Sequence, residues 1–391
     1  MKNLVENKIA IVGGHLTPAL AVLEELERRK YDSIIWVGSK YSQTGNKNTS
    51  PEYQLIKNLN IKFIELKAGK LWRKYTLKTI IPGIYNLVLI PLGFIKSLII
   101  VLIYQPDLIL SFGGYLALPM VIAAKVFRKK IITHEQTIVT GTTNKIIAKF
   151  ADIVLISWEQ SKKYFPPKKT ILVGLPLRGN ILANKNSNRV FNNDLPVVFV
   201  VGGNQGSNTI NWRLLEILPY ILEHANIIHL TGNSTITHDF EKAKQAQASL
   251  SPIYRDRYIV NDHLFGSESR YSSYINQCDI ILSRSGANTI AEILTLGKLA
   301  VLIPIPWTSH NEQHLNAQMV KDSGLGYILN QTLDLQPADL KNALIKALEA
   351  HSKKVDFNGR DINASRAQAM NLIDTLASQK FVDQVESLLA R

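Results

Sequence analysis

Two glycine-rich loops in the second half of the chain contain the residue types that hold phosphate groups. The apolar run Val197–Val201 predicts a buried strand, and Gly202, Gly203 and Gly206 follow it before a helical pattern opens near Ser207. Glycine lets the backbone approach a ligand closely, and the first amides of a helix attract anions. The loop predicts a site for a phosphate-bearing ligand, although a tight strand-to-helix turn without a ligand explains these residues equally well.

The second loop, Ser283–Glu292, also follows an apolar run. Thr289 and Glu292 have the spacing of a capping box, in which two side chains close the N-terminus of a helix. The alternative is that Glu292 accepts hydrogen bonds from a ribose diol while the loop amides hold phosphate. Taken alone, the spacing favours the cap.

A third loop, Trp307–Ala317, is rich in side chains that suit sugar hydroxyls. His310 and His314 are four residues apart, a spacing that can hold a metal ion on one helix face. The residue after His310 is Asn311, so the glutamate that a His-Glu-x-x-His hydrolase uses as its base is missing. The pattern argues against a zinc hydrolase.

In the first half, Gly13, Gly14 and His15 follow the first predicted strand. An imidazole can act as a base near neutral pH, although a single histidine at a helix entrance is more often a capping or packing residue. Phe112–Tyr115 and Thr133–Gln136 end two further strands. Because the carboxyl ends of parallel strands share one edge of a sheet, the three loops favour a site there.

The elements that must position these loops form two series of strands. The apolar runs that predict these strands do not alternate strictly between apolar and polar residues, and helical patterns separate them. Both features are typical of parallel sheets covered by helices on both faces. Each half therefore predicts a doubly wound α/β domain. The first series is Lys8–Val12, Ser33–Val37, Ile61–Glu65, Leu108–Ser111, Lys130–Thr133 and Ile153–Ile156. The second series is Pro196–Val201, Ile227–Leu230, Tyr258–Val260, Asp279–Ser283 and Leu299–Ile303.

Length and charge agree with two domains that differ in net charge. The 391 residues exceed one ordinary core, and the polar stretch Leu182–Asp194 predicts the linker. Residues 1–190 carry 28 Lys and Arg against 11 Asp and Glu, whereas residues 191–391 carry 17 against 20. This asymmetry indicates an anionic partner for the first half, either nucleic acid or a membrane. The single Cys278 suits a reducing compartment, and no secretion signal is expected at the N-terminus.

The segment Thr79–Tyr104 is apolar and long enough to cross a bilayer, with Lys96 as its one charge. Pro91 is expected to divide it into two helical pieces, each short for a span, of which the second runs into the buried strand Leu108–Ser111 as a crossover helix does. Upstream lie basic and aromatic residues suited to an anionic membrane surface, namely Lys67, Lys70, Trp72, Arg73, Lys74, Tyr75 and Lys78. We therefore predict peripheral docking, with a buried helix pair as the alternative.

The order of these loops resembles the MurG family of UDP-N-acetylglucosamine transferases. The matching motifs run from the first strand to about residue 330. They are Gly13–Ala19, Gly113–Tyr115, His134–Gln136, Thr143–Lys145, Val173–Arg178, Val201–Ser207, Arg284–Glu292 and Gln313–Ala317. Each motif is weak alone, but the ordered set is specific.

The resemblance implies a GT-B fold, in which two Rossmann-like domains face each other across a cleft. The N-terminal acceptor- and membrane-binding domain is then 1–181, and the UDP-sugar domain is 195–368. A C-terminal helix within 369–391, near Ala369–Leu389, returns to the first domain. The implied enzyme is an inverting glycosyltransferase of peptidoglycan and cell-wall synthesis. It moves GlcNAc from UDP-GlcNAc to the 4-hydroxyl of the muramyl sugar of lipid I, forming lipid II.

The resemblance also implies the site residues. His15 corresponds to the family's proposed base, with Glu135 as the other catalytic candidate. The donor residues are Arg178, Gly202, Gly203, Asn204, Gln205, Gly206, Asn211, Arg284, Ala287, Asn288, Thr289, Glu292, Gln313 and Asn316. The acceptor residues are Gly13, Gly14, Tyr115, His134 and Asn144.

The implied partners are UDP-GlcNAc, an undecaprenyl-pyrophosphoryl lipid and an anionic membrane surface at the cytoplasmic face. No metal, other cofactor or nucleic acid is expected. The chain departs from the family at a shortened first glycine loop and at Thr137, Asn204, Asn288 and Glu312. The donor motifs match better than the acceptor motifs, so the resemblance identifies the donor more closely.

Three alternatives stay open: a GT-B transferase for another polyprenyl-phosphate or diacylglycerol acceptor, a UDP-GlcNAc 2-epimerase, and a non-catalytic membrane scaffold. The apolar, basic segment near 70–104 argues against a soluble epimerase. The donor-site residues argue against a scaffold.

Overall fold

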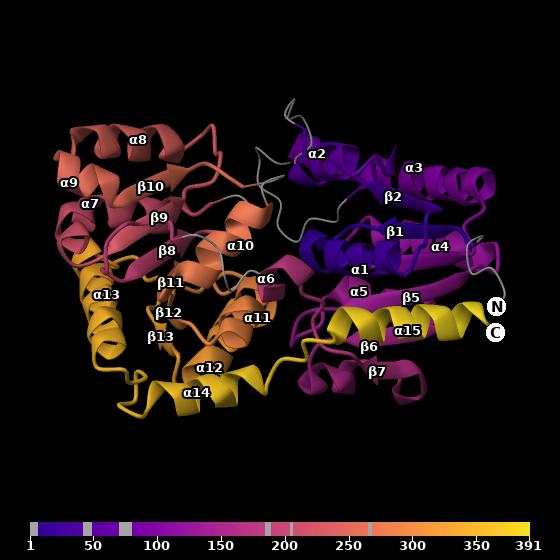
Figure 1. Cartoon of the computed structure of the whole chain (residues 1–391). Helices are drawn as coiled ribbons and strands as arrows, with labels where there is room; N and C mark the ends of the chain where they lie inside the picture. The colour runs from indigo at the N-terminus through magenta and orange to yellow at the C-terminus, as the bar shows by residue number, and fades with distance from the viewer. Residues whose placement is uncertain (1–6, 42–48, 70–79, 184–188, 204–205, 265–267) are drawn as a thin grey trace. The chain divides into compact units, whose positions relative to one another are not determined.

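The computed structural model describes residues 7–41, 49–69, 80–183, 189–203, 206–264 and 268–391 (Figure 1). The chain divides into two compact units. Unit 1 comprises Met1–Arg178 and Asp374–Arg391, and unit 2 comprises Gly179–Ile373. Each unit is built around one parallel sheet, which confirms the predicted α/β class.

The sheet of unit 1 has seven described strands in the order β3-β2-β1-β4-β5-β6-β7. They are β1 Ile9–Val12, β2 Ile34–Gly38, β3 Lys62–Glu65, β4 Leu108–Ser111, β5 Lys130–Glu135, β6 Ile153–Ile156 and β7 Thr170–Leu172. The strand order reverses between β1 and β4, where Val12 pairs with Ser111. The two strands therefore end at the same level, and this edge is the switch point at which such sheets bind ligands.

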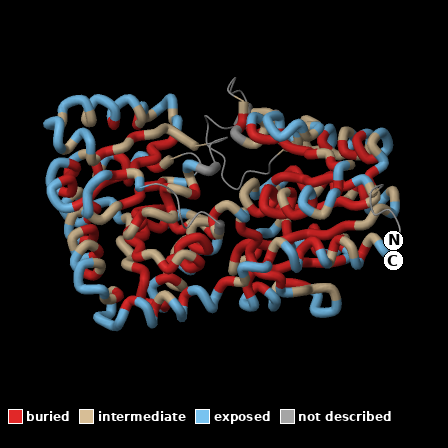
Figure 2. Tube along the Cα trace, in the orientation of Figure 1, coloured by how far each residue is buried: buried red, intermediate tan, exposed pale blue. Residues whose placement is uncertain are grey.

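Helices cover both faces of this sheet. They are α1 Leu16–Arg28, α2 Pro51–Asn58, α3 Ile80–Tyr104, α4 Ala117–Val126, α5 Thr142–Phe150 and α15 Ala377–Leu389, with 3-10 turns at Glu159–Tyr164 and Pro167–Lys169. Helices α3, α4 and α5 pack side by side, and α1 lies beside α15 (Figure 1). The apolar faces of α3, α4 and α5 close a core with Ala10, Val12 and Ile109 of the sheet. Figure 2 shows the interior strands buried along most of their length, as their continuous apolar runs require, whereas the edge strands β3 and β7 are only partly buried.

Helix α15 carries the C-terminus back to unit 1. Phe381 stacks on Phe112 with ring centroids 5.5 Å apart, and Arg29 of α1 pairs with Glu386 at 2.8 Å. The predicted single helix Ala369–Leu389 is wrong in extent. Ala369 belongs to the separate helix α14 Ile362–Met370 in unit 2, and only Ala377–Leu389 returns.

The sheet of unit 2 has six described strands in the order β10-β9-β8-β11-β12-β13. They are β8 Val197–Val201, β9 Asn226–Leu230, β10 Tyr258–Asn261, β11 Ile280–Ser283, β12 Leu299–Leu302 and β13 Gly326–Ile328. Here the order reverses between β8 and β11, and Val201 pairs with Ser283. The two predicted phosphate loops thus begin next to each other.

The helices of unit 2 also lie on both faces. They are α6 Gly179–Ala183, α7 Asn208–His224, α8 Asp239–Ser249, α9 Pro252–Asp256, α10 Glu268–Gln277, α11 Ala287–Leu296, α12 Glu312–Asp322, α13 Pro337–Ser352 and α14, with a 3-10 turn η5 at Ser309–Asn311. Helix α7 packs with α8, α9 and α13, whereas α11 packs with α12 and α14. Leu182 and Ala183 of the predicted linker belong to α6, and residues 184–188 lie outside the described residues.

Helix α3 corrects one prediction. It runs unbroken through Pro91 over 25 residues, so the expected division into two short helices is wrong. Proline removes one backbone hydrogen bond, to the carbonyl of Leu87. Both Pro91 and Leu87 lie on the exposed side of the helix, where that carbonyl can find another donor. The helix instead connects β3 to β4 as one crossover.

Candidate active site

The loops after β1 and β4 touch each other at the switch point of unit 1. A Cβ atom built on Gly14 would lie 2.0 Å from the carbonyl oxygen of Gly113. Gly113 and Gly114 have φ of +77° and +80°, a left-handed backbone that favours glycine. The glycines therefore let two backbones meet at one point and leave their polar groups at the strand ends.

We expect Gly14→Ala to destabilise unit 1 by about 1–3 kcal/mol, because the added methyl group overlaps backbone atoms that cannot swing away. Urea unfolding followed by circular dichroism measures the change. Gly179→Ala is the matched control, since nothing lies within 4 Å of a Cβ atom built there. Equal stability of the two variants would show that the contact between the loops is not tight.

His15 lies at the entrance of α1 and is half-buried. Its Nδ1 is 3.0 Å from the carbonyl oxygen of Phe112. A carbonyl oxygen only accepts, so Nδ1 carries the proton and Nε2 has the free lone pair of a base. The capping alternative is not supported, because the His15 side chain makes no cap hydrogen bond.

Glu135, at the end of β5, is held by two neighbours. Its Oε1 accepts from the Thr137 hydroxyl at 2.7 Å and from the Thr137 amide at 3.0 Å, and its Oε2 accepts from Asn144 Nδ2 at 3.0 Å. Asn144 Oδ1 is buried without a partner among the described residues, and it lies 2.6 Å from a Cβ atom built on Gly113. This cluster orients Asn144 at the glycine loop and leaves Glu135 buried.

His134 lies in the core behind Phe112, the first residue of the loop after β4. It is fully buried, packs against Phe112 and Phe381, and its Nε2 lies 3.1 Å from the Ser157 hydroxyl. Burial lowers the pKa of His134 to about 3, so the ring is neutral. The predicted direct contact of His134 with an acceptor does not fit this position, because the ring is part of the core.

Tyr115 is 39% exposed beside the same loops. Burial of its hydroxyl, together with the charge of Glu52, raises the pKa of Tyr115. Its position leaves it accessible to solvent, and its role as an acceptor residue stays a prediction.

Glu52, which the sequence analysis missed, belongs to the same edge. Its Oε1 accepts from Trp36 Nε1 at 2.7 Å, and a Cβ atom built on Gly13 would lie 1.9 Å from it. Burial raises the pKa of Glu52 to about 7 against the opposing hydrogen bonds from Trp36 and Ser39. A carboxylate in the first turn of a helix is ordinarily explained by its favourable interaction with the helix dipole. The sequence alone therefore gave no reason to expect the contact of Glu52 with Trp36.

In unit 2, helices α7 and α11 both begin at the switch-point edge without a side-chain cap. Neither has an acidic residue in its first turn. Cβ atoms built on Gly202 and Gly206 would lie 2.2 Å from Ser207 N and 2.0 Å from Thr231 O. Gly202 and Gly206 therefore lie too close to neighbouring backbone atoms for a side chain, and the two uncapped helix ends beside them favour an anion. Asn204 and Gln205 of the predicted site lie outside the described residues.

Arg284 ties the two loops together. Its Nε donates to Ser207 Oγ at 2.9 Å, and its Nη1 donates to the Ile303 carbonyl at 2.9 Å and to Gln331 Oε1 at 2.7 Å. Burial, helped by the positive charge of Arg213, lowers the pKa of Arg284 to about 10. The guanidinium stays charged at neutral pH and places a cation at the start of both helices.

Glu292 is not part of a capping box. Helix α11 begins at Ala287 with Gly286 as its N-cap, so Thr289 lies inside the first turn. The Glu292 carboxylate is buried and accepts from the Tyr271 hydroxyl at 2.7 Å. The favoured structural explanation of Thr289 and Glu292 is therefore wrong, and Ala287, Asn288 and Thr289 form the uncapped turn of α11.

The third loop contributes residues to the same edge. Gln313 Oε1 accepts from the Ile305 amide at 3.0 Å, and Asn316 Nδ2 donates to the Ser285 carbonyl at 3.1 Å. His310 lies in η5 with φ of +55°, whereas His314 belongs to α12. Gln313 and Asn316 are thus bound to the loops that follow β11 and β12.

Two residues that were predicted to bind the UDP-sugar already form hydrogen bonds with other residues of their own unit. Asn211 Nδ2 donates to the Thr231 carbonyl at 2.8 Å and to Asp239 at 3.0 Å, and its Oδ1 lies 3.0 Å from His229 Nε2. A direct contact of Asn211 with the UDP-sugar, as predicted, does not fit this buried network. The network instead positions the loop after β9. Arg178 Nε and Nη2 donate to Glu24 Oε1 of α1, each at 3.1 Å.

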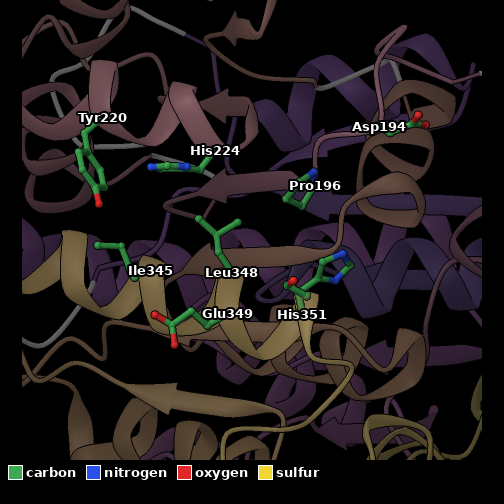
Figure 3. Close-up of a pocket in the computed structure, with 9 residues that line it drawn as sticks. Asp194, Pro196, Tyr220, His224, Ile345, Leu348, Glu349 and His351 are labelled. Carbon is green, nitrogen blue, oxygen red and sulfur yellow. The ribbon is translucent and has the colours of Figure 1, made fainter.

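A separate cavity of about 560 Å³ lies in unit 2 between α7 and α13 (Figure 3). Tyr220, His224 and His351 line it together with Pro196, the residue before β8. It is therefore at the amino ends of the strands, away from the loops with the predicted donor residues.

The similarity to known protein families divides at about the same place in the chain as the two units. Residues 12–156 match the glycosyltransferase family 28 N-terminal domain, and residues 197–376 match the glycosyltransferase family 28 C-terminal domain. The chain is 30% identical, over 95% of each chain, to the UDP-N-acetylglucosamine--N-acetylmuramyl-(pentapeptide) pyrophosphoryl-undecaprenol N-acetylglucosamine transferase of Geotalea uraniireducens. It is 31% identical to the protein of the same name from Desulfotalea psychrophila, over 89% of each chain.

Two solved structures show the same fold. The crystal structure of Acinetobacter baumannii MurG matches with a TM-score of 0.65 and 21% identity, over 97% of this chain and 99% of that one. The S. aureus MnaA-UDP co-structure matches with a TM-score of 0.64 and 11% identity, over 98% and 97%. These likenesses confirm the GT-B arrangement of two Rossmann-like domains.

Proposed function

The chain belongs to the MurG family within glycosyltransferase family 28, and we propose from this that it transfers GlcNAc from UDP-GlcNAc to lipid I. The acceptor atom is the 4-hydroxyl oxygen of the muramyl sugar, and the products are lipid II and UDP. The uncapped ends of α7 and α11, joined by Arg284, carry this proposal. They offer an anion site of the kind that a sugar nucleotide diphosphate needs.

The donor would be held at three points in unit 2. The Gly202–Gly206 loop and the first amides of α11 suit the diphosphate. Glu292 suits the ribose diol, since a carboxylate accepts from two hydroxyl groups. Gln313 and Asn316 suit the sugar hydroxyls.

The chemistry would be a displacement with inversion at the anomeric carbon. His15 Nε2 takes the proton of the acceptor hydroxyl as its oxygen attacks, and the bond from the anomeric carbon to the UDP oxygen breaks. Helix amides and Arg284 stabilise the negative charge that develops on UDP. The fixed tautomer of His15 supports its assignment as the base.

The acceptor side would use unit 1. Asn144 Oδ1 lacks a donor among the described residues, and it lies at the glycine loops with Tyr115 exposed nearby. A hydroxyl or amide group of the lipid acceptor could donate a hydrogen bond to this oxygen. Glu135 then acts by orienting Asn144, a role that its buried contacts favour over proton transfer.

Mass analysis of the lipid product after incubation of the purified protein with UDP-GlcNAc and lipid I in detergent tests this function. We expect lipid I to gain one N-acetylhexosamine residue. Transfer to a different polyprenyl or diacylglycerol lipid, with lipid I untouched, would overturn the acceptor assignment. Conversion of UDP-GlcNAc to its 2-epimer without an acceptor would indicate an epimerase instead.

We also propose that α3 docks unit 1 on the cytoplasmic face of the membrane. Asn86–Tyr104 is long and apolar enough to span a bilayer, and 22% of it is buried. An outward stripe, hereafter the α3 stripe, is between 47% and 58% exposed and consists of Ile84, Val88, Leu92, Ile95, Ile99 and Leu102. The inward face instead contains the buried polar residues Asn86 and Ser97. Because both ends of α3 return to the same sheet, peripheral contact fits better than spanning.

The triple change Val88→Ser, Leu92→Ser, Ile95→Ser should weaken binding to anionic liposomes roughly tenfold or more, since each buried apolar side chain contributes about 1 kcal/mol. Vesicle sedimentation at rising salt measures it, and wild-type binding should fall as basic residues are screened. Ile236→Ser with Leu333→Ser is the control, because both residues are exposed apolar side chains of unit 2. Undiminished binding of the triple variant would remove the α3 stripe from the docking surface. The basic residues Lys70, Arg73, Lys74 and Lys78, with Trp72 and Tyr75, lie outside the described residues.

A further inference from the structure

Arg284 is a buried cation whose described hydrogen-bond partners are all neutral. Its side chain donates to a hydroxyl, a backbone carbonyl and an amide oxygen, which belong to Ser207, Ile303 and Gln331. Burial lowers its pKa, and the charged neighbour that adds to this shift is Arg213, a second cation. Because charges inside proteins are ordinarily paired, this guanidinium, in a residue that is 8% exposed, lacks a counter-ion among the described residues.

The missing counter-ion fits the ligand that unit 2 is proposed to bind. Arg284 belongs to the loop before α11 and reaches Ser207, the N-cap of α7, and both helices begin without a side-chain cap. Its Nη2 donates to none of the described residues. A diphosphate supplies the required anion, and guanidinium N–H groups match phosphate oxygens in geometry. Arg284 can therefore pair with the substrate as long as the groups that hold its other nitrogens do not cancel its charge.

Gln331 makes a contact of this neutral kind from outside the two phosphate loops. It follows β13, and its Oε1 accepts from Arg284 Nη1 at 2.7 Å. An arginine side chain donates and does not accept, so the amide oxygen of Gln331 faces the guanidinium. The same loop is fixed further along, where the Leu335 carbonyl accepts from Arg213 Nε and Nη2 at 3.0 and 2.7 Å. Gln331 therefore lies on a segment that is anchored to α7.

We propose that Gln331 is a positioning residue for the diphosphate, which orients the Arg284 guanidinium through a neutral oxygen and leaves its positive charge to the substrate. The inference rests on the proposed function, because it takes the diphosphate to bind at the starts of α7 and α11. It adds a residue outside every motif by which the donor site was predicted. A carboxylate at position 331 would orient the guanidinium equally well, but it would also neutralise the charge.

This difference between an amide and a carboxylate gives the test. Gln331→Glu keeps the shape of the side chain and an oxygen that accepts from Arg284, so the melting temperature should be retained. Gln331→Leu keeps the approximate size of the side chain and removes the acceptor. Leu333→Glu is the matched control, because Leu333 belongs to the same loop and is fully exposed, so that the new carboxylate stays in solvent.

The experiment measures the affinity of the full-length protein for UDP by calorimetric titration and for uridine by NMR titration. Uridine lacks the diphosphate, so the ratio of the two affinities reports on the phosphate contacts. Gln331→Glu should lower the preference for UDP about 10- to 100-fold, the range for interactions of a charged group, with uridine binding unchanged. Gln331→Leu should lower it about threefold to tenfold, since the guanidinium loses one orienting acceptor. Leu333→Glu should keep the wild-type preference.

A double substitution separates positioning from stability. In an Arg284→Gln background, Gln331→Leu should have no further effect on the preference for UDP, because its effect passes through the guanidinium. A purely structural Gln331 would instead lower the affinities for UDP and uridine together, in parallel with the melting temperature.

A wild-type preference in Gln331→Glu would overturn the proposal, because the charge at position 331 would then have no effect on the diphosphate. Equal losses for UDP and uridine, or the same loss in Leu333→Glu as in Gln331→Glu, would overturn it as well. Each of these results leaves UDP binding and GlcNAc transfer by the wild type intact, and so leaves the proposed function standing. Absence of UDP binding or of transfer in the wild type would instead overturn the proposed function.

Discussion

His15→Ala is expected to lower turnover about 100- to 10,000-fold while UDP affinity stays close to that of the wild type, the range for loss of a general base. The carbonyl of Phe112 holds the proton on Nδ1, so that Nε2 is available to the acceptor hydroxyl. UDP affinity should not change, because His15 belongs to unit 1, whereas the residues predicted to bind the UDP-sugar, other than Arg178, belong to unit 2. Turnover is measured with saturating UDP-GlcNAc and lipid I, and UDP affinity by calorimetry.

His224→Ala serves as the control, because His224 is an exposed histidine at the end of α7 and outside both predicted site halves. EDTA should leave wild-type turnover unchanged, since no step invokes a metal. Near-normal turnover of His15→Ala would take the role of base away from His15. Glu135→Gln would then be tested next, although the contacts of Glu135 with Thr137 and Asn144 favour an orienting role.

Interior strands could be predicted from the sequence because burial on both faces demands continuous apolar runs. Leu108–Ser111 and Ile153–Ile156 were predicted with the limits that the structure shows. The edge strands β7 and β13 were missed. Each has three residues and is only partly buried, so its composition need not be apolar.

The tight glycine turn after β8 could be predicted, because glycines between an apolar strand and a helix indicate such a turn, whereas the direction of a polar side chain could not. Asn211 and His134 have the chemistry of ligands but point into buried networks. Spacing also misplaced the start of α11, since Thr289 fits an N-cap while the helix begins at Ala287. Tertiary partners such as Tyr271 for Glu292, or Trp36 for Glu52, leave no local pattern.

Glu292→Gln is expected to weaken UDP binding by about 1.5–3 kcal/mol, roughly 10- to 150-fold, because the charge-assisted bonds to the ribose hydroxyls are lost. The amide keeps the shape of the side chain, and its oxygen can still accept from Tyr271. The melting temperature should therefore change much less than the affinity. This separation is what distinguishes a ligand from a purely structural carboxylate.

Calorimetric titration with UDP beside a thermal melt of the same preparation measures both quantities. Glu223→Gln is the control, because Glu223 is an exposed carboxylate on α7 of the same unit. A lowered melting temperature with unchanged UDP affinity would mean that Glu292 serves only to hold α10 on α11. A ribose-binding Glu292 predicts the opposite pattern, since the hydrogen bond with Tyr271 survives the substitution and the negative charge does not.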